Sequence, residues 1–195
     1  MKEAPAVFDK MLKEHMDCFK TLDGLRDPIN EAADTIRSAL MAGKKILICG
    51  NGGSASDAQH FAAEIVGRFT RERKAWPAIA LTTDSSILTA VANDYGYDTI
   101  FARQVEGLGQ PDDVLIGIST SGNSPNVIKA LEQAQKIDMA TVALTGNGGG
   151  TLADLADMAV KAPSDVTARI QEVHIFILHF WADTAEAALL AQEGF

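Results

Sequence analysis

The sequence predicts an α/β protein in which five parallel strands form a sheet between helices, with further helices at both chain ends. Short apolar runs typical of buried strands alternate with helical segments through residues 44–160. Such alternation implies right-handed crossovers and a sheet covered on both faces. Apolar residues at helical spacing also occupy residues 3–22, before the sheet, and 165–190, after it. These observations together predict the fold class.

The leading segment, residues 1–43, is expected to be a helical pair that precedes the sheet. The first helix covers residues 3–22, and the second begins near Asp27-Pro28, where proline suits a first turn, and ends at Gly43. The pair either caps its own domain or packs on a neighbouring subunit, and the sequence does not separate these alternatives. Residues 44–195 are expected to supply the α/β core and the terminal helix of a single domain spanning 1–195.

The core elements follow from apolar runs and from the turns between them. Strands are expected at 46–49, 78–81, 114–118, 139–144 and 157–160. Helices are expected after the first strand, from Ser85 to Asn93 behind a cap at 82–85, at 99–107 and at 125–136. The last helix, 165–190, carries an apolar seam that we expect to pack on another helix and to join an oligomer interface: Val166, Ile170, Val173, Ile177, Phe180 and Thr184.

Composition excludes several classes of protein. The net charge of −9 argues against a general nucleic-acid binder, which is usually basic. Cys18 and Cys49 lack metal or redox spacing, which favours a reducing compartment. The first residues contain no apolar signal core, and no run approaches the roughly 18 apolar residues of a membrane span. We therefore expect a soluble cytoplasmic protein.

A glycine-rich loop directly follows the first predicted strand. Gly50, Asn51, Gly52 and Gly53 permit a tight turn, and Ser54 is expected to cap the helix that follows. Free backbone amides at a helix N-terminus suit an anion such as phosphate. The loop also fits the loose dinucleotide pattern G-x-G-x-x-A, but the nearest acidic residue at the end of the next predicted strand, Asp84, lies 34 residues after Gly50 rather than about 20. A phosphate site is the favoured interpretation.

A second loop, after the strand at 114–118, is rich in hydroxyl groups. It contains Ser119, Thr120, Ser121 and Ser124 between a buried strand and a helix. Hydroxyl donors and helix N-terminal amides can surround phosphate oxygens without a lysine. The alternative is an ordinary capped turn, which four hydroxyls within six residues make less favourable. This loop therefore predicts a site for a phosphate monoester.

His60 and Glu64 lie four residues apart on the helix after the glycine loop, and so on one face. Taken singly, the histidine would more often be structural and the glutamate solvated. Their pairing beside a phosphate loop favours a base or a metal-ligand pair. Apolar neighbours predict that Glu64 is partly buried, and burial raises a carboxyl pKa toward the range of a general base. On the last helix, periodicity alone would pair His179 with Glu172 rather than Gln171.

Five motifs in order, GNGGS, AQHFAAE, ANDYG, GISTSGNS and ARIQEVHIFILH, resemble the bacterial phosphoheptose isomerases, which are sugar isomerase (SIS) domain proteins. The resemblance covers nearly the whole chain, including the leading helices. It implies a flavodoxin-like sheet, a homotetramer and the conversion of sedoheptulose 7-phosphate, a phosphorylated seven-carbon sugar, into D-glycero-D-manno-heptose 7-phosphate. That reaction is an early step in making the heptose of lipopolysaccharide. The implied chemistry is proton transfer between C1 and C2 through an enediolate.

The resemblance also implies roles for individual residues. Glu64 would be the catalytic base and His179 the acid. A zinc ion, found in some members, would be bound by His60, Glu64, Gln171 and His179. Some relatives have an aspartate where this chain has Ala168, so this chain lacks a carboxylate at that position. The substrate would contact Asn51, Gly52, Gly53, Glu64, Asn93, Asp94, Ser119, Thr120, Ser121, Ser124 and Gln171.

Three competing functions stay open at this point. Non-catalytic paralogues bind the bacterial replication initiator, but they lack the glutamate and the last histidine, whereas this chain has Glu64 and His179. A domain that senses sugar phosphates without turnover is the second alternative. Another aldose–ketose isomerase, for example of a pentose phosphate, is the third, because the sequence does not fix the sugar's length. We favour the isomerase over the interaction protein.

Overall fold

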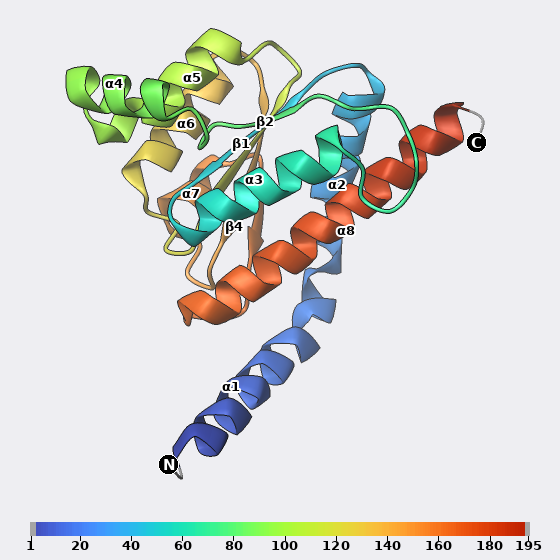
Figure 1. Ribbon diagram of the computed structural model, residues 1–195, viewed down its shortest axis with the longest axis vertical. Coiled ribbons are helices and arrows are strands. Elements are labelled where there is room, and N and C mark those ends of the chain that lie inside the picture. Colours follow the sequence, from blue (N-terminus) through green and yellow to red (C-terminus); the bar gives the residue numbers. More distant parts are fainter. Residues whose placement is uncertain (1–2, 194–195) are drawn as a thin grey trace.

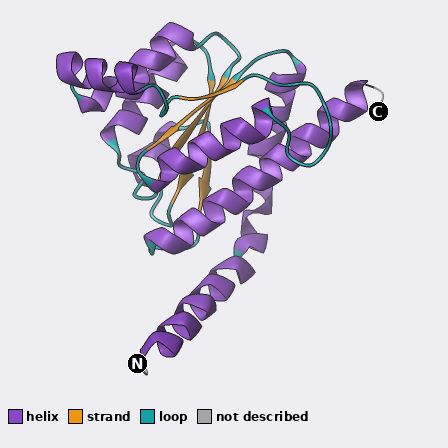
Figure 2. Cartoon of the chain, in the orientation of Figure 1, coloured by secondary structure: helices purple, strands orange, loops and turns teal. Residues whose placement is uncertain are grey.

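A parallel sheet of five strands forms the centre of the protein in the computed structural model, which describes residues 3–193 (Figures 1 and 2). The strands run in the order β2-β1-β3-β4-β5, and every neighbouring pair is parallel. This is the flavodoxin-like order, so the predicted fold class is confirmed. The strands are β1 (Ile46–Gly50), β2 (Ala78–Ala80), β3 (Val114–Ser119), β4 (Ala140–Thr145) and β5 (Met158–Lys161).

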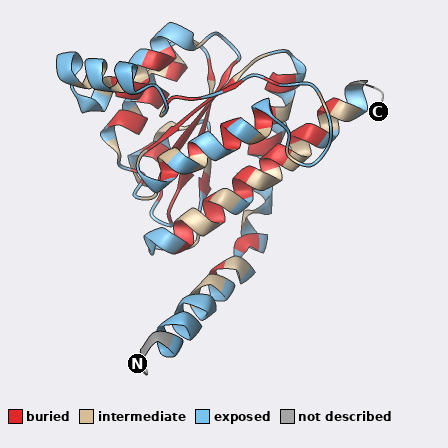
Figure 3. Ribbon diagram, in the orientation of Figure 1, coloured by how far each residue is buried: buried red, intermediate tan, exposed pale blue. Residues whose placement is uncertain are grey.

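Helices cover both faces of the sheet, because side chains alternate between the faces along each strand. Ile46 and Ile48 face one apolar core, whereas Leu47 and Cys49 face the other. The first core is covered by α2 (Arg26–Met41), α3 (Gly53–Val66) and α8 (Thr167–Glu193). The second is covered by α4 (Ser85–Tyr95), α5 (Ile100–Leu108), α6 (Pro125–Lys136) and α7 (Gly150–Leu155). Buried segments accordingly concentrate along the strands and the inner helix faces (Figure 3).

The two chain ends behave differently. Helix α1 (Glu3–Lys20) projects from the body, and a 3₁₀ turn at Leu22–Leu25 connects it to α2 (Figure 1). Its apolar side chains are largely exposed: Val7, Phe8, Met11, Leu12 and Met16. On α8, by contrast, Ile170, Val173 and Ile177 are buried in the protein's own core. Part of the seam therefore packs on helices of the same chain, whereas Val166 is exposed, and the role of α8 in an oligomer interface stays a prediction.

Most predicted elements appear within a few residues of their expected ends. The carboxylate of Asp84 caps α4 by accepting a hydrogen bond from the Ile87 amide at 2.9 Å. Ser54 is not a cap: α3 begins at Gly53, its N-cap is Gly52 with a positive φ of 57°, and Ser54 is buried within the first turn. Glycine takes this backbone conformation without strain, so the helix begins two residues earlier than the serine indicated. Helix α7 was not predicted.

Helix α8 is the one helix among residues 3–193 that is long and apolar enough to span a membrane by length and composition. Half of the apolar stretch that meets this criterion, within Thr167–Gln192, is buried inside the protein. The indole of Trp181 donates a hydrogen bond of 2.9 Å to the carbonyl of Ile29 on α2, and Trp181 itself is fully buried. This packing is that of a core helix.

Candidate active site

The carboxyl ends of β1 and β3 meet at the topological switch point of the sheet, where ligands bind in doubly wound folds. Asn51, after β1, and Asn126, at the start of α6, exchange two side-chain hydrogen bonds of 2.9 and 2.8 Å. The phenol of Tyr97 donates to the same Asn51 oxygen at 3.2 Å. The glycine loop and the hydroxyl loop are therefore held together across the switch point. A small cavity of about 150 Å³ opens beside them, lined in part by Gly52 and Tyr97.

The hydroxyl loop gathers its serine side chains around one point. The hydroxyl of Ser119 lies 2.9 Å from that of Ser124 and 3.4 Å from that of Ser121. Ser124 occupies the N-cap position of α6, yet its hydroxyl caps no amide of that helix. Hydroxyls at a helix N-terminus add donors to the free amides and to the positive end of the dipole. The loop therefore has the features of a phosphate site.

The hydroxyl loop contacts the loop after β4 through main-chain atoms of glycine residues. Gly122 has a positive φ of 68°, and a Cβ added there would overlap the carbonyl of Gly149. The Gly122 carbonyl in turn accepts a hydrogen bond from the Leu152 amide at 2.9 Å. Asn123 spans the same gap, because its side-chain oxygen accepts hydrogen bonds from both the amide and the hydroxyl of Thr151 at 3.1 Å. Glycine at position 122 thus permits the loop's shape.

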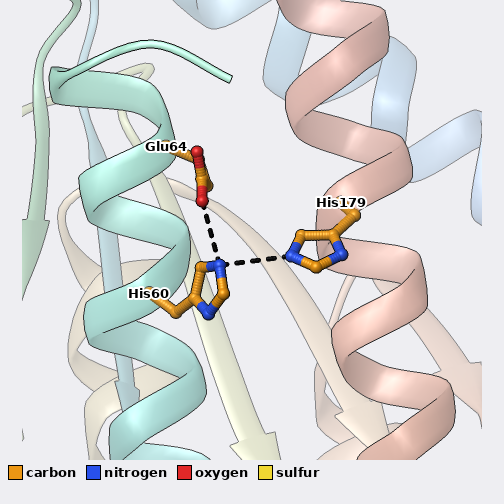
Figure 4. Close-up of side chains that lie close together, drawn as sticks. All are labelled: His60, Glu64 and His179. Carbon is orange, nitrogen blue, oxygen red and sulfur yellow. Dashed lines mark hydrogen bonds and ion pairs between the residues drawn. The ribbon is translucent and has the colours of Figure 1, made fainter. Parts of the chain in front are cut away.

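A second group of side chains converges between α3 and α8. Nε2 of His60 lies 2.9 Å from Oε1 of Glu64 and 3.2 Å from Nε2 of His179 (Figure 4). The His60 and His179 rings meet edge to face, with centroids 5.0 Å apart. His60 is exposed, whereas Glu64 and His179 are partly buried. The helical spacing of four brings Glu64 to His60, and the packing of α8 along α3 brings in His179.

The hydrogen bonds among these three side chains cannot all be satisfied at once, but the three side chains are suitable metal ligands. A neutral His60 ring carries one hydrogen, which its Nε2 cannot donate fully to both neighbours. Candidate ligand atoms from all three residues lie within 4.8 Å of one another. Two imidazole nitrogens and a carboxylate oxygen are the donor set of many catalytic zinc sites, which leave the fourth position open. The residues present therefore fit a divalent cation such as zinc.

Gln171, the fourth expected ligand, lies elsewhere in this chain. Its side-chain amide abuts Gly53, where a Cβ would overlap it. Gly53 precedes His60 by seven residues, about 10 Å along α3, and Gln171 precedes His179 by eight on α8. The structure thus joins His60, Glu64 and His179 in one group and places Gln171 beside the glycine loop.

The remaining expected residues occupy other positions. Asn93 and Asp94 are exposed at the end of α4, where the Asn93 amide donates to the Asp94 carboxylate at 2.8 Å. Thr120 is partly exposed in the hydroxyl loop, and its carbonyl accepts a hydrogen bond from the Gly146 amide at 3.1 Å. Ala168 is exposed in the first turn of α8, so this chain presents only a methyl group there.

One carboxylate near the His60 group was not among the predicted site residues. Asp57 lies three residues before His60 on α3 and is half-buried. Its Oδ2 has no hydrogen-bond partner among the residues that the structure describes. Burial raises the pKa of this carboxyl group, and the nearby charge of His60 opposes the rise. Asp57 thus places a second carboxyl group, besides that of Glu64, on the α3 face that carries His60.

Sequence reasoning also missed the residues that support the site. Tyr97 and Asn126 hold Asn51, and Phe69 packs its ring on His179 with centroids 5.5 Å apart. Phe69 lies in a loop, where no periodicity shows which way a side chain points. The proline at the start of α6 was the one available signal for Asn126, since it marks the helix start beside the hydroxyl loop.

Known proteins share both the fold and the sequence of this chain. A family model described as SIS domain matches residues 12–146. A phosphoheptose isomerase of Helicobacter pylori (strain ATCC 700392 / 26695) is 56% identical over 167 residues, which are 86% of this chain and 87% of the relative. Among solved structures, the phosphoheptose isomerase GmhA from Neisseria gonorrhoeae is 45% identical with a TM-score of 0.85, covering 95% of this chain and 98% of that chain. A phosphoheptose isomerase from Francisella tularensis is 39% identical with a TM-score of 0.86, covering 95% and 97%.

The matched fold and sequence define the class of protein. The chain belongs to the SIS domain family and, within it, to the phosphoheptose isomerases, as its motifs predicted.

Proposed function

We propose that the protein is an aldose–ketose isomerase that converts sedoheptulose 7-phosphate into D-glycero-D-manno-heptose 7-phosphate. The observation that carries the proposal is the convergence of His60, Glu64 and His179 from two helices. Its membership of the phosphoheptose isomerases supports the same activity. A protein that only binds the replication initiator would have no use for this group, so we do not favour that alternative.

Glu64 and His179 divide the proton transfers in this proposal. Glu64 takes a proton from one of the carbons C1 and C2 and returns it to the other. His179 exchanges protons at the sugar oxygens as the enediolate forms and collapses. Both groups lie on helices rather than loops, so their spacing is set by packing. The ring of Phe69 covers one side of His179 and limits the orientations of the imidazole.

The same group is proposed to bind zinc. His60, Glu64 and His179 would hold the ion, and Gln171 stays a predicted ligand that this chain places beside Gly53. When bound, zinc supplies Lewis-acid stabilisation of negative charge on the substrate oxygens. Because Glu64 is both candidate base and candidate ligand, metal content and turnover must be measured in the same preparation.

The phosphate of the substrate is proposed to bind at the hydroxyl loop. Ser119, Ser121 and Ser124 supply hydroxyls around one point, and the N-terminus of α6 supplies amides. Asn51, Gly52 and Gly53 would contact the sugar from the opposite loop. Asn93, Asp94, Thr120 and Gln171 stay proposed substrate contacts.

We also propose a cytoplasmic homotetramer that needs no nucleic-acid or membrane partner. The exposed apolar side chains of α1 support assembly, because a second copy of the chain would cover them. Cys18 and Cys49 are free and buried, which supports a reducing compartment.

The decisive experiment is a coupled assay of the purified protein on sedoheptulose 7-phosphate, with and without a chelator. The variant Glu64→Gln should lose at least about 10²-fold in kcat, the lower end of general-base effects, while still binding substrate. The control is Glu106→Gln on α5, which removes an exposed carboxylate paired with Arg103 and should leave kcat unchanged. If wild type turns over no sugar phosphate, or Glu64→Gln turns over as fast as wild type, the proposal fails.

A further inference from the structure

A fully buried carboxylate on α8 organises the loop that follows α3. Glu186 lies seven residues, or about 10 Å, beyond His179 along the helix. It accepts hydrogen bonds from the backbone amides of Phe69, Thr70 and Arg71 at 2.8–2.9 Å. It also accepts one from the Thr70 hydroxyl at 3.1 Å. Burial alone would raise the pKa of Glu186, but the loop's hydrogen bonds outweigh burial and lower it to about 2. The group is therefore ionised at neutral pH.

Of the arginines that pair with Glu186, Arg73 reaches back to the helix that carries Glu64. Nε of Arg73 donates to Glu186 at 3.0 Å, and its Nη2 donates to the main-chain carbonyl of Glu64 at 2.6 Å. Its Nη1 donates to the carbonyl of Ile65 at 2.9 Å, as well as to two loop carbonyls. The guanidinium is almost fully buried and stacks 3.8 Å from the ring of Trp76. Arg73 thus caps the C-terminal end of α3, where a positive charge is favourable.

Both ends of this arrangement touch the candidate active site. Arg73 binds the main-chain carbonyl of Glu64, the residue whose side chain is the candidate base. Through the Phe69 amide, Glu186 fixes the loop whose phenyl ring lies against His179. Figure 1 shows this loop passing over α8 on its way to β2. The pair therefore connects the helix of the candidate base with the helix of the candidate acid.

We infer that the Glu186–Arg73 pair is a positioning element of the active site, which fixes α3 and α8 at the spacing that the His60, Glu64 and His179 group requires. This inference rests on the proposed function for its catalytic consequence. A buried ion pair is not by itself a source of stability, since well-packed apolar residues of similar size often replace one at no cost. Apolar residues could neither accept hydrogen bonds from three loop amides nor donate to four carbonyls, as this pair does.

Glu186→Gln tests the inference, because glutamine keeps the shape but presents an NH₂ group to backbone amides that are themselves donors. Small misplacements of reacting groups are costly, so we expect kcat to fall about 10- to 100-fold while KM stays within about twofold. The control Val105→Ala removes buried volume from α5 on the other face of the sheet. It should lower Tm and leave kcat unchanged.

A second measurement does not depend on turnover. The chain has four histidines, so their imidazole signals can be assigned by NMR. In Glu186→Gln the signals of His60 and His179 should shift or broaden, while those of His15 and His174 should stay in place. In Val105→Ala all four should stay in place. If wild type proves inactive, the proposed function fails, but the histidine signals still decide whether the pair positions this group.

Arg73→Lys provides the second variant, and it decides the matter if Glu186→Gln does not fold. Lysine keeps the charge beside Glu186 but cannot span the carboxylate and the α3 carbonyls together. The same two histidine signals should move. The inference is overturned if a folded variant of either residue keeps wild-type His60 and His179 signals, or if an active variant keeps wild-type kcat.

Discussion

His174 should make the protein lose stability in mildly acidic solution. The residue is fully buried on α8, and its Nε2 lies 3.0 Å from the carbonyl oxygen of Thr145. Its Nδ1 has no hydrogen-bond partner among the described residues. Burial lowers the pKa of His174 from 6.5 to about 4, against a smaller opposing effect of the Thr145 bond. The folded protein therefore holds this ring neutral at a pH where the unfolded chain would protonate it.

The sign and the size of the effect follow from that difference. Between pH 6.5 and 4 the unfolded state binds the extra proton, so the free energy of unfolding falls as the solution is acidified. At about 1.4 kcal/mol per pKa unit, the lowered pKa of His174 removes about 3 kcal/mol across this interval. By pH 4.5 about 2 kcal/mol of it is gone. That is a large part of the 5–15 kcal/mol by which domains are typically stable.

Urea unfolding at pH 7 and pH 4.5 measures the effect. His174→Gln keeps an N–H donor for the Thr145 carbonyl and cannot titrate, so the variant should lose about 2 kcal/mol less than wild type between the two pH values. Other titrating groups, including Glu186, contribute equally to both proteins and cancel. Equal losses in wild type and variant would refute the reasoning.

Three further predictions concern the phosphate site and α1. Ser119→Ala should raise KM roughly tenfold or more at unchanged kcat, since a hydrogen bond to a charged group contributes about 1.5–3 kcal/mol; steady-state kinetics with an unchanged KM would contradict the site. Gly122→Ala should destabilise the protein by more than about 1–2 kcal/mol, which is the cost of the left-handed backbone alone. The added Cβ would also overlap the Gly149 carbonyl, so thermal unfolding that matches wild type would contradict this contact. Phe8→Glu combined with Met16→Glu on the exposed face of α1 should dissociate the assembly in sedimentation velocity without lowering the helix content, and a variant that stays assembled would exclude α1 as the contact.

The sheet and two of the three residues of the His60 group were predictable because they depend on local patterns. Short apolar runs and intervening helices restrict a parallel sheet to few topologies, and a spacing of four brings His60 to Glu64. His179 lies 119 residues from His60, and no periodicity joins positions on different helices. Only the resemblance to known isomerases placed it there, and that resemblance also named Gln171, which this chain puts beside Gly53.

What the sequence left open has physical causes as well. Helix α8 packs on α2, α3 and the sheet, so its seam is apolar for reasons internal to one chain. A seam buried in a protein's own core and one buried by a partner look the same in a sequence. The support from Arg73 and Glu186 was invisible because loop residues carry no repeating pattern. A charged pair in a loop and a helix is also more often solvated than buried.

The contact between α2 and α8 has a consequence for how the chain matures during synthesis. Trp181, near the end of the chain, binds the carbonyl of Ile29, near its beginning, across 152 residues. Until the last helix leaves the ribosome, the apolar face of α2 and the strands beneath it lack their cover. A nascent chain therefore exposes an aggregation-prone surface throughout its elongation, and contacts this distant in sequence form slowly. Premature termination anywhere before His179 yields a product that lacks a side chain of the proposed active site and much of the helix that covers one core.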